Sequence, residues 1–125
     1  MRCLIVDDNA SFVVAARRIL DGGELSVVGE AATATEALQR ADELSPDVIL
    51  LDIDLAGESG LDVARQLARR ANGAGPDIVL ISAYPEDDFA DLIAEAPAVG
   101  FVPKSDLSAA AVVGLLRTRR LRGAQ

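Results

Sequence analysis

The sequence predicts an α/β fold in which a five-stranded parallel sheet carries helices on both faces. Five short apolar runs are spread along the 125 residues, and a stretch with helical periodicity follows each of them. Strict alternation of strands and helices favours parallel strands, because each parallel neighbour needs a crossover connection that packs a helix against the sheet.

The predicted elements follow one another in a regular order. The strands span residues 2–6, 25–30, 47–51, 77–81 and 98–102, and the helices span roughly 10–21, 33–44, 58–71, 86–95 and 106–121. In the third helix Leu61, Ala64 and Leu67 recur on one face while Arg65 lies on another, which is typical of a helix that covers a sheet. Glycine or proline follows each of the first four helices, at 22–23, 46, 73–76 and 97.

Composition excludes several classes of protein. The net charge of −8 disfavours direct binding to a nucleic-acid backbone. No apolar run approaches the roughly 18 residues of a membrane span, so a cytoplasmic location is expected. The length indicates a single domain over residues 1–122 with a tail at 123–125. The single cysteine, Cys3, lies among apolar neighbours and is expected to be a buried, inert thiol.

Acidic residues follow two of the predicted strands. Asp7 and Asp8 come after the first strand, and Asp52 and Asp54 come after the third. In open parallel sheets the ligand site lies outside the carboxyl ends of the strands. Clustered carboxylates repel one another, so either their pKa values rise or a cation neutralises them. Mg²⁺ prefers oxygen ligands and is the cation that we predict.

Two further polar residues follow the fourth and fifth strands, Ser82 and Lys104. Lys104 is the single lysine among twelve basic residues, and its ammonium is a compact charge on a flexible stem. Any one of these polar residues is explained by loop solvation, but together they indicate a site. The chain has no histidine, so a phosphohistidine donor would have to be another molecule.

Four motifs carry a resemblance to a known family. They are "LIVDD" (4–8), "ILLDIDLAGESG" (49–60), "VLISA" (79–83) and "GFVPKS" (100–105). In this order they resemble the receiver domains of two-component response regulators, over essentially the whole chain. The resemblance implies a flavodoxin-like (βα)5 fold with strand order 2-1-3-4-5. It also implies a signalling switch, not a turnover enzyme, that takes a phosphoryl group from a histidine kinase or phosphotransfer protein.

The resemblance assigns roles to the acidic residues. Asp52 is the expected phosphoacceptor, and Asp8 and Asp52 are the expected direct ligands of Mg²⁺. Asp7 is expected to hold the ion through water, and the main-chain carbonyl of Asp54 is the remaining protein ligand. A carboxylate nucleophile, a metal ion and a lysine suffice for phosphoryl transfer, which depends on positioning and charge stabilisation.

The remaining roles concern the switch. Lys104 is expected to share the charge on the phosphoryl group and Ser82 to donate a hydrogen bond to it. Phe101 is the aromatic that the family turns inward on activation, although a permanently buried core ring remains an alternative. The expected readout surface comprises the fourth helix, the fifth strand and the fifth helix.

This readout surface favours a protein partner. The fourth predicted helix has the acids Glu86, Asp87, Asp88, Asp91 and Glu95 around Phe89, Leu92 and Ile93. The fifth ends in "RTRRLR" (117–122), which either favours the negative end of the helix dipole, forms a partner patch or begins a linker. A homodimer that joins Arg119 of one copy to these acids of the other is one hypothesis, and a heterologous partner is the other.

Three departures from the family pattern stand out. Ala56 occupies the position of a usual proline and is expected to loosen the loop after the acceptor. Ser105 follows Lys104 in place of the common proline, which excludes a cis Lys-Pro bond. Asp54 and Tyr84 lie at variable positions that tune the lifetime of the phosphoryl group.

Two other functions fit parts of the sequence. A haloacid-dehalogenase-like phosphatase would use Asp52 and Asp54 as its D-x-D pair, but such enzymes need further acids downstream of the lysine, whereas Asp7 and Asp8 lie upstream. An inert interaction module of receiver ancestry is disfavoured by the complete acidic set. The chain is expected to be a stand-alone receiver, with a piece of a longer helix-turn-helix transcription factor as the alternative.

Overall fold

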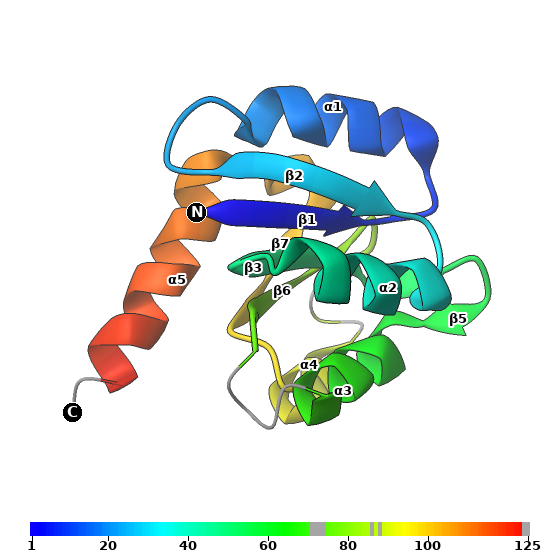
Figure 1. The fold of residues 1–125 in the computed structure, drawn as a ribbon. Helices are drawn as coiled ribbons and strands as arrows, with labels where there is room; N and C mark the ends of the chain where they lie inside the picture. Colours follow the sequence, from blue (N-terminus) through cyan, green and yellow to red (C-terminus); the bar gives the residue numbers. More distant parts are fainter. Residues whose placement is uncertain (71–74, 86, 88, 124–125) are drawn as a thin grey trace.

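Five parallel strands form the central sheet, in the order β2-β1-β3-β6-β7 (Figure 1). The strands are β1 (Arg2–Val6), β2 (Ser26–Ala31), β3 (Val48–Asp52), β6 (Asp77–Ser82) and β7 (Gly100–Pro103). Counted along the chain, these five have the order 2-1-3-4-5, as predicted. The computed structural model describes residues 1–70, 75–85, 87 and 89–123, with side chains of the last helix described only through residue 118.

Helices cover both faces of this sheet, as predicted (Figure 1). The helices are α1 (Ala10–Leu20), α2 (Ala34–Leu44), α3 (Gly60–Arg70), α4 (Ala90–Glu95) and α5 (Ala109–Gly123). Helices α1 and α5 pack on one face, while α2, α3 and α4 pack on the other. Polar side chains cap the N-termini of α1 and α2. Asn9 accepts a hydrogen bond from the backbone N–H of Phe12, and Thr33 accepts one from the backbone N–H of Glu36.

Two hydrophobic clusters fill the space between the sheet and its helices. Because successive side chains of a strand point to opposite faces, each strand contributes to both clusters. Toward α1 and α5 lie Cys3, Ile5, Val48, Leu50, Val79 and Ile81. Toward α2, α3 and α4 lie Leu4, Val6, Ile49, Leu51, Ile78 and Leu80. Cys3 is fully buried, as expected, and burial raises the pKa of its thiol to about 12.

The structure corrects three of the predicted boundaries. The third helix begins at Gly60 and not at 58, because residues 58 and 59 pair with 54 and 55 in a short hairpin. The fourth begins at Ala90 because the backbone of Phe89 is not helical, with φ −132° and ψ 13°. The fifth begins at Ala109, after a 3-10 helix η2 (Lys104–Asp106) and a cap by Ser108, whose Oγ accepts from Ala111 N.

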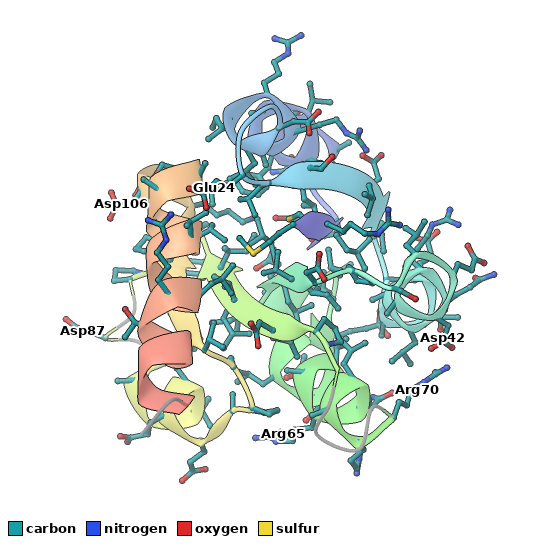
Figure 2. The ribbon with its side chains drawn as sticks, turned by 60° about the vertical axis from the view of Figure 1, so that its left-hand side comes forward. Glu24, Asp42, Arg65, Arg70, Asp87 and Asp106 are labelled. Carbon is teal, nitrogen blue, oxygen red and sulfur yellow. The ribbon has the colours of Figure 1, made fainter. Side chains whose placement is uncertain are left out.

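Ion pairs connect elements at the surface. Arg70 of α3 pairs with Asp42 of α2, and Figure 2 shows these two side chains side by side. Arg117 of α5 lies 2.9 Å from Glu24, which precedes β2. Such exposed pairs contribute about 0–1 kcal/mol each, so the apolar clusters supply most of the stability. No helix among the described residues is both long and apolar enough to cross a bilayer.

Candidate functional site

Three carboxylates meet at the carboxyl edge of the sheet. Asp7 follows β1 directly, Asp8 is the next residue, and Asp52 is the last residue of β3. One carboxylate oxygen from each lies within 4.8 Å of the others. Asp7 and Asp52 are 2% and 5% exposed, whereas Asp8 is exposed to solvent. The structure therefore brings together the three acids that the sequence analysis singled out for a cation.

Lys104 lies against this cluster from the start of η2. Its Nζ is 2.7 Å from Oδ2 of Asp7 and 3.1 Å from Oδ2 of Asp52. Burial by itself favours the neutral amine, but hydrogen bonds and charge from both carboxylates outweigh that effect and raise the pKa of Lys104. The single lysine is therefore a fixed positive charge beside two buried carboxylates.

The surroundings of Asp52 disfavour the ionised form of its carboxylate. Burial raises its pKa to about 6, and the neighbouring charge of Asp7 acts in the same direction. The backbone N–H of Asp54, which donates to Oδ1 of Asp52 at 3.1 Å, lowers the pKa, as does Lys104. At neutral pH the side chain is ionised, but its charge is incompletely compensated.

A hairpin of β4 (Asp54–Leu55) and β5 (Glu58–Ser59) follows the strand that ends in Asp52. Its two-residue loop has positive φ at both positions, 48° at Ala56 and 89° at Gly57, as type I′ turns require. Proline has φ fixed near −65° and cannot occupy this position of the turn. Ala56 therefore lies in a paired hairpin turn that proline could not adopt, and the expectation that it loosens the loop stays a prediction.

Gly60 closes the hairpin against the end of β3. Its N–H donates to the carbonyl of Ile53 at 2.7 Å. A Cβ at this position would overlap the main-chain carbonyl oxygen of Asp52. Gly60 is the last residue of the motif at 49–60, and a glycine at a helix start beside an acidic strand end is a signal of close backbone approach.

A cavity of about 290 Å³ opens above Asp52. Its lining includes Asp8, Asp54, Ser82, Tyr84 and Lys104. Ser82 is buried at the end of β6, and its Oγ accepts a hydrogen bond from the backbone N–H of Tyr84 at 3.0 Å. The predicted strand-end residues other than Asp7 thus border one space, which is large enough for a tetrahedral oxyanion.

Phe101 lies away from this cavity, on β7. It pairs in register with Leu80, and its half-buried ring packs against the cluster on the side of α2, α3 and α4. Ser82 is two residues beyond Leu80 on the same strand, so Ser82 and Phe101 belong to the same face of the sheet.

Two residues that the sequence analysis did not single out also belong to the site. The ring centroid of Phe12 is 4.5 Å from Nζ of Lys104. Asn9 borders the cavity, and its backbone N–H donates to Oδ1 of Asp7 at 2.9 Å. Asn9 directly precedes a predicted helix, so the preference of asparagine for the N-cap was a signal for it. An apolar residue in an amphipathic helix gives no comparable signal for a contact with a cation.

Residues 3–112 match the model of the response regulator receiver domain. The chain belongs to this family. As a receiver domain it is a component of two-component signalling, and the phosphatase alternative receives no support, because the acids upstream of Asp52 complete the acidic cluster and the family match covers most of the chain.

Individual relatives agree with this identification. The receiver domain is 37% identical to the response regulator GacA of Pseudomonas viridiflava over 107 residues, which cover 83% of this chain and 48% of GacA. It is 42% identical to a protein-glutamate methylesterase/protein-glutamine glutaminase of Myxococcus xanthus over 106 residues, which cover 83% of this chain and 30% of that protein. The chain spans about half the length, or less, of the curated relatives named here.

A solved structure supports both the fold and the family. The signal receiver domain of the putative response regulator NarL from Mycobacterium tuberculosis superposes with a TM-score of 0.76 and 32% sequence identity. The match covers 90% of this chain and 93% of that one.

Proposed function

We propose that this receiver domain accepts a phosphoryl group on Asp52 from a histidine kinase or a phosphotransfer protein. The observation that carries the proposal is the position of Lys104, whose Nζ lies 3.1 Å from Oδ2 of Asp52 at the floor of the cavity. A nucleophilic carboxylate with an adjacent fixed cation and an open space in front of it suits phosphoryl transfer, which needs alignment and charge stabilisation more than acid-base chemistry.

The acidic cluster fits Mg²⁺. Three carboxylates offer oxygens within 4.8 Å of one another, and the two buried ones, Asp7 and Asp52, share the single ammonium of Lys104. We assign Asp8, Asp52 and the main-chain carbonyl of Asp54 as direct ligands, with Asp7 acting through water. When bound, the ion supplies positive charge to the oxygens of the transferred group and lowers the repulsion among the acids.

The residues of the chain perform the transfer itself. A carboxylate oxygen of Asp52 forms a bond to phosphorus while the phosphorus–nitrogen bond of the donor phosphohistidine breaks, and the departing imidazole keeps the electron pair. Asp52 reacts in its ionised form, so it needs no base. The backbone N–H of Asp54 holds Oδ1 of Asp52, which limits rotation of the carboxylate.

Phosphorylation would act on the rest of the molecule through Ser82. Its hydroxyl is committed to no acceptor that the structure records, and it borders the same cavity as Asp52. A hydrogen bond to the phosphoryl group would draw the end of β6 toward Asp52. Because Phe101 shares a sheet face with Ser82, this movement changes the space available to its ring, and a surface that includes β7 changes with it.

The readout surface would then bind a protein. On α4, Asp91 and Leu92 are exposed, and Leu92 is 47% exposed. Helix α4 packs its half-buried Ile93 against the core, while its other residues are exposed and available to a partner. Glu86, Asp88 and Arg119, which the dimer hypothesis also used, lie outside the described residues or side chains. We propose a homodimer through α4, β7 and α5 as the first candidate and a cytoplasmic setting in which the domain is a switch, not an enzyme.

Labelling at a single residue tests the acceptor. Acetyl phosphate with Mg²⁺ should add one phosphoryl group to the wild type and none to Asp52→Asn, as measured by intact mass. Asp54→Asn is the matched control, because it changes the other member of the D-x-D pair and should still be labelled. Equal labelling of Asp52→Asn and the wild type would refute the assignment.

The metal assignment has a separate test. Asp8 is exposed, whereas the ion pairs of Lys104 go to Asp7 and Asp52, so Asp8→Asn removes a ligand without removing either pair. We expect at least about tenfold weaker Mg²⁺ binding, measured by titration calorimetry. Unchanged Mg²⁺ affinity would exclude Asp8 as a ligand.

A further inference from the structure

We infer that Phe12 is a positioning residue for Lys104, holding its ammonium group beside Asp7 and Asp52. The inference rests on the proposed function, in that Lys104 is taken to act on the phosphoryl group. It assigns to a residue of α1 a part in the reaction that the acidic motifs do not contain. Phe12 acts through Lys104 and is not itself a catalytic residue.

The position of the ring supports this role. The ring centroid lies 4.5 Å from Nζ of Lys104, within the range of a cation–π contact. An ammonium group has three N–H donors, and two neighbours of this one are the carboxylates of Asp7 and Asp52. The ring covers a further side, and the side chain of Lys104 is only 15% exposed as a result of these contacts. The ammonium is therefore enclosed by two carboxylates and an aromatic ring.

The ring is itself held in place from two directions. Phe12 is half-buried and packs against the cluster between the sheet and the pair α1 and α5. Its backbone N–H donates to Oδ1 of Asn9 at 3.1 Å, and the backbone N–H of Asn9 donates to Oδ1 of Asp7 at 2.9 Å.

These contacts close a circuit. Asp7 accepts from the N–H of Asn9, and Asn9 caps the first turn of α1 by accepting from the N–H of Phe12. The ring of Phe12 faces Lys104, and Lys104 pairs with Asp7. The first turn of α1 and the active-site lysine are thus fixed relative to the same carboxylate.

A restrained lysine has a consequence for the reaction. The lysine side chain is long and flexible, and much of its rotamer freedom is lost when it is held in one place. A ring that restricts the stem before the phosphoryl donor arrives reduces the ordering that remains for the transition state. Leucine at this position would fill the space but would lack the negative face of the ring that attracts the ammonium.

The accessibility of the Lys104 ammonium can be measured directly by chemical modification. Because Lys104 is the single lysine, its side chain and the amino terminus are the two amines of the chain. The rate of reductive methylation at Lys104, followed by peptide mass in EDTA, reports how freely its ammonium leaves the enclosure. This measurement does not require that Asp52 be phosphorylated.

Three variants distinguish the effect of the aromatic ring on Lys104 from the effect of apolar volume at this position. Phe12→Leu keeps an apolar side chain, Phe12→Tyr keeps the ring, and Val14→Ala is a matched control at an exposed position of the same helix. We expect Phe12→Leu to methylate Lys104 about three- to tenfold faster than the wild type and to be phosphorylated at Asp52 more slowly by a similar factor. Phe12→Tyr and Val14→Ala should both match the wild type. Thermal melts of all three identify any general loss of structure.

The outcomes distinguish this inference from the proposed function. If Phe12→Leu stays folded and methylates Lys104 at the wild-type rate, Phe12 does not hold the lysine and the inference falls. If methylation responds to the ring but Asp52 of the wild type accepts no phosphoryl group, the positioning of Lys104 stands and the acceptor assignment falls. If Lys104 is methylated as fast in Phe12→Tyr as in Phe12→Leu, an aromatic ring is not what the site requires, and the inference is overturned.

Discussion

Gly60 stands against the main-chain carbonyl of Asp52, with no room for a side chain between them. The contact joins the first residue of α3 to the last residue of β3, across the hairpin that separates them. The neighbour is backbone, which cannot rotate away as a side chain can. The position of the Asp52 carboxylate therefore depends on a glycine eight positions later in the chain.

We predict that Gly60→Ala destabilises the protein by about 1–3 kcal/mol, because the new methyl group forces the strand end and the helix apart. It should also reduce phosphorylation of Asp52 at temperatures where the variant is fully folded. Urea unfolding measures the first effect and acetyl-phosphate labelling the second. Gly114→Ala is the control: an added Cβ meets nothing within 4 Å there, and we expect stabilisation of about 0.5–1 kcal/mol. Equal stabilities of Gly60→Ala and the wild type would contradict the close contact.

The turn of the hairpin gives a second prediction. Ala56→Pro should lower the free energy of unfolding by at least about 1 kcal/mol, because proline cannot adopt the φ of 48° found there. Ala56→Gly should be neutral or stabilising by up to about 1 kcal/mol, since glycine adopts positive φ without strain but loses more entropy on folding. Urea unfolding of both variants is the measurement. A proline variant as stable as the wild type would show that the loop has another conformation in solution.

Asp52 gives a prediction about pH. Its pKa in the folded protein is about 6, above its usual value of 3.8, so the native state favours the protonated form. The stability contributed by this group is therefore present below about pH 4 and is lost as the pH rises through 6. Asp52→Asn removes this loss, and in EDTA at pH 7.5 we expect the variant to be more stable than the wild type by about 1–3 kcal/mol.

The difference between the two proteins should shrink as the pH is lowered toward 4. Urea unfolding at several pH values measures it, with Asp54→Asn as an exposed control that should follow the wild type throughout. A stability difference that is the same at pH 4 and at pH 7.5 would show that a charge on Asp52 is not its cause.

Cys3 provides a probe of global opening. Burial raises the pKa of its thiol to about 12, so the native protein presents almost no thiolate near pH 8. We predict that Ellman's reagent modifies Cys3 at least about a hundredfold more slowly in the native protein than in urea. Rapid modification without denaturant would show that β1 opens far more readily than its interior position between β2 and β3 implies.

Much of this architecture was predictable because its signals are local. Five apolar runs predicted the five strands, and the rule that parallel strands end at one edge was enough to bring Asp7, Asp8 and Asp52 together. Lys104 was conspicuous as the single lysine. In each case the type of residue and its position relative to a strand were enough for the prediction.

Other features were not predictable, for physical reasons. The strands of the hairpin are two residues long, too short to show an alternating pattern, and alanine is an uncommon residue at the positive φ of its turn. The start of α4 depends on the backbone of Phe89, which carries no recognisable cap. The contact between Phe12 and Lys104 joins side chains that are far apart in the sequence, and only the fold makes them neighbours.

The two-sided core has a further consequence. Asp52 continues the row of Leu50, whose side chain faces α1 and α5, whereas Ser82 continues the row of Leu80 and Phe101, on the opposite face. The reacting carboxylate and the ring assigned to the switch thus occupy separate compartments, with the sheet as a partition. In the proposed switch, the effect of phosphorylation would pass from one side of the sheet to the other through the main chain at the end of β6. Under the proposed function, a partner bound to α4 and β7 would respond to phosphorylation of Asp52 without contacting the side of the sheet on which Asp52 lies.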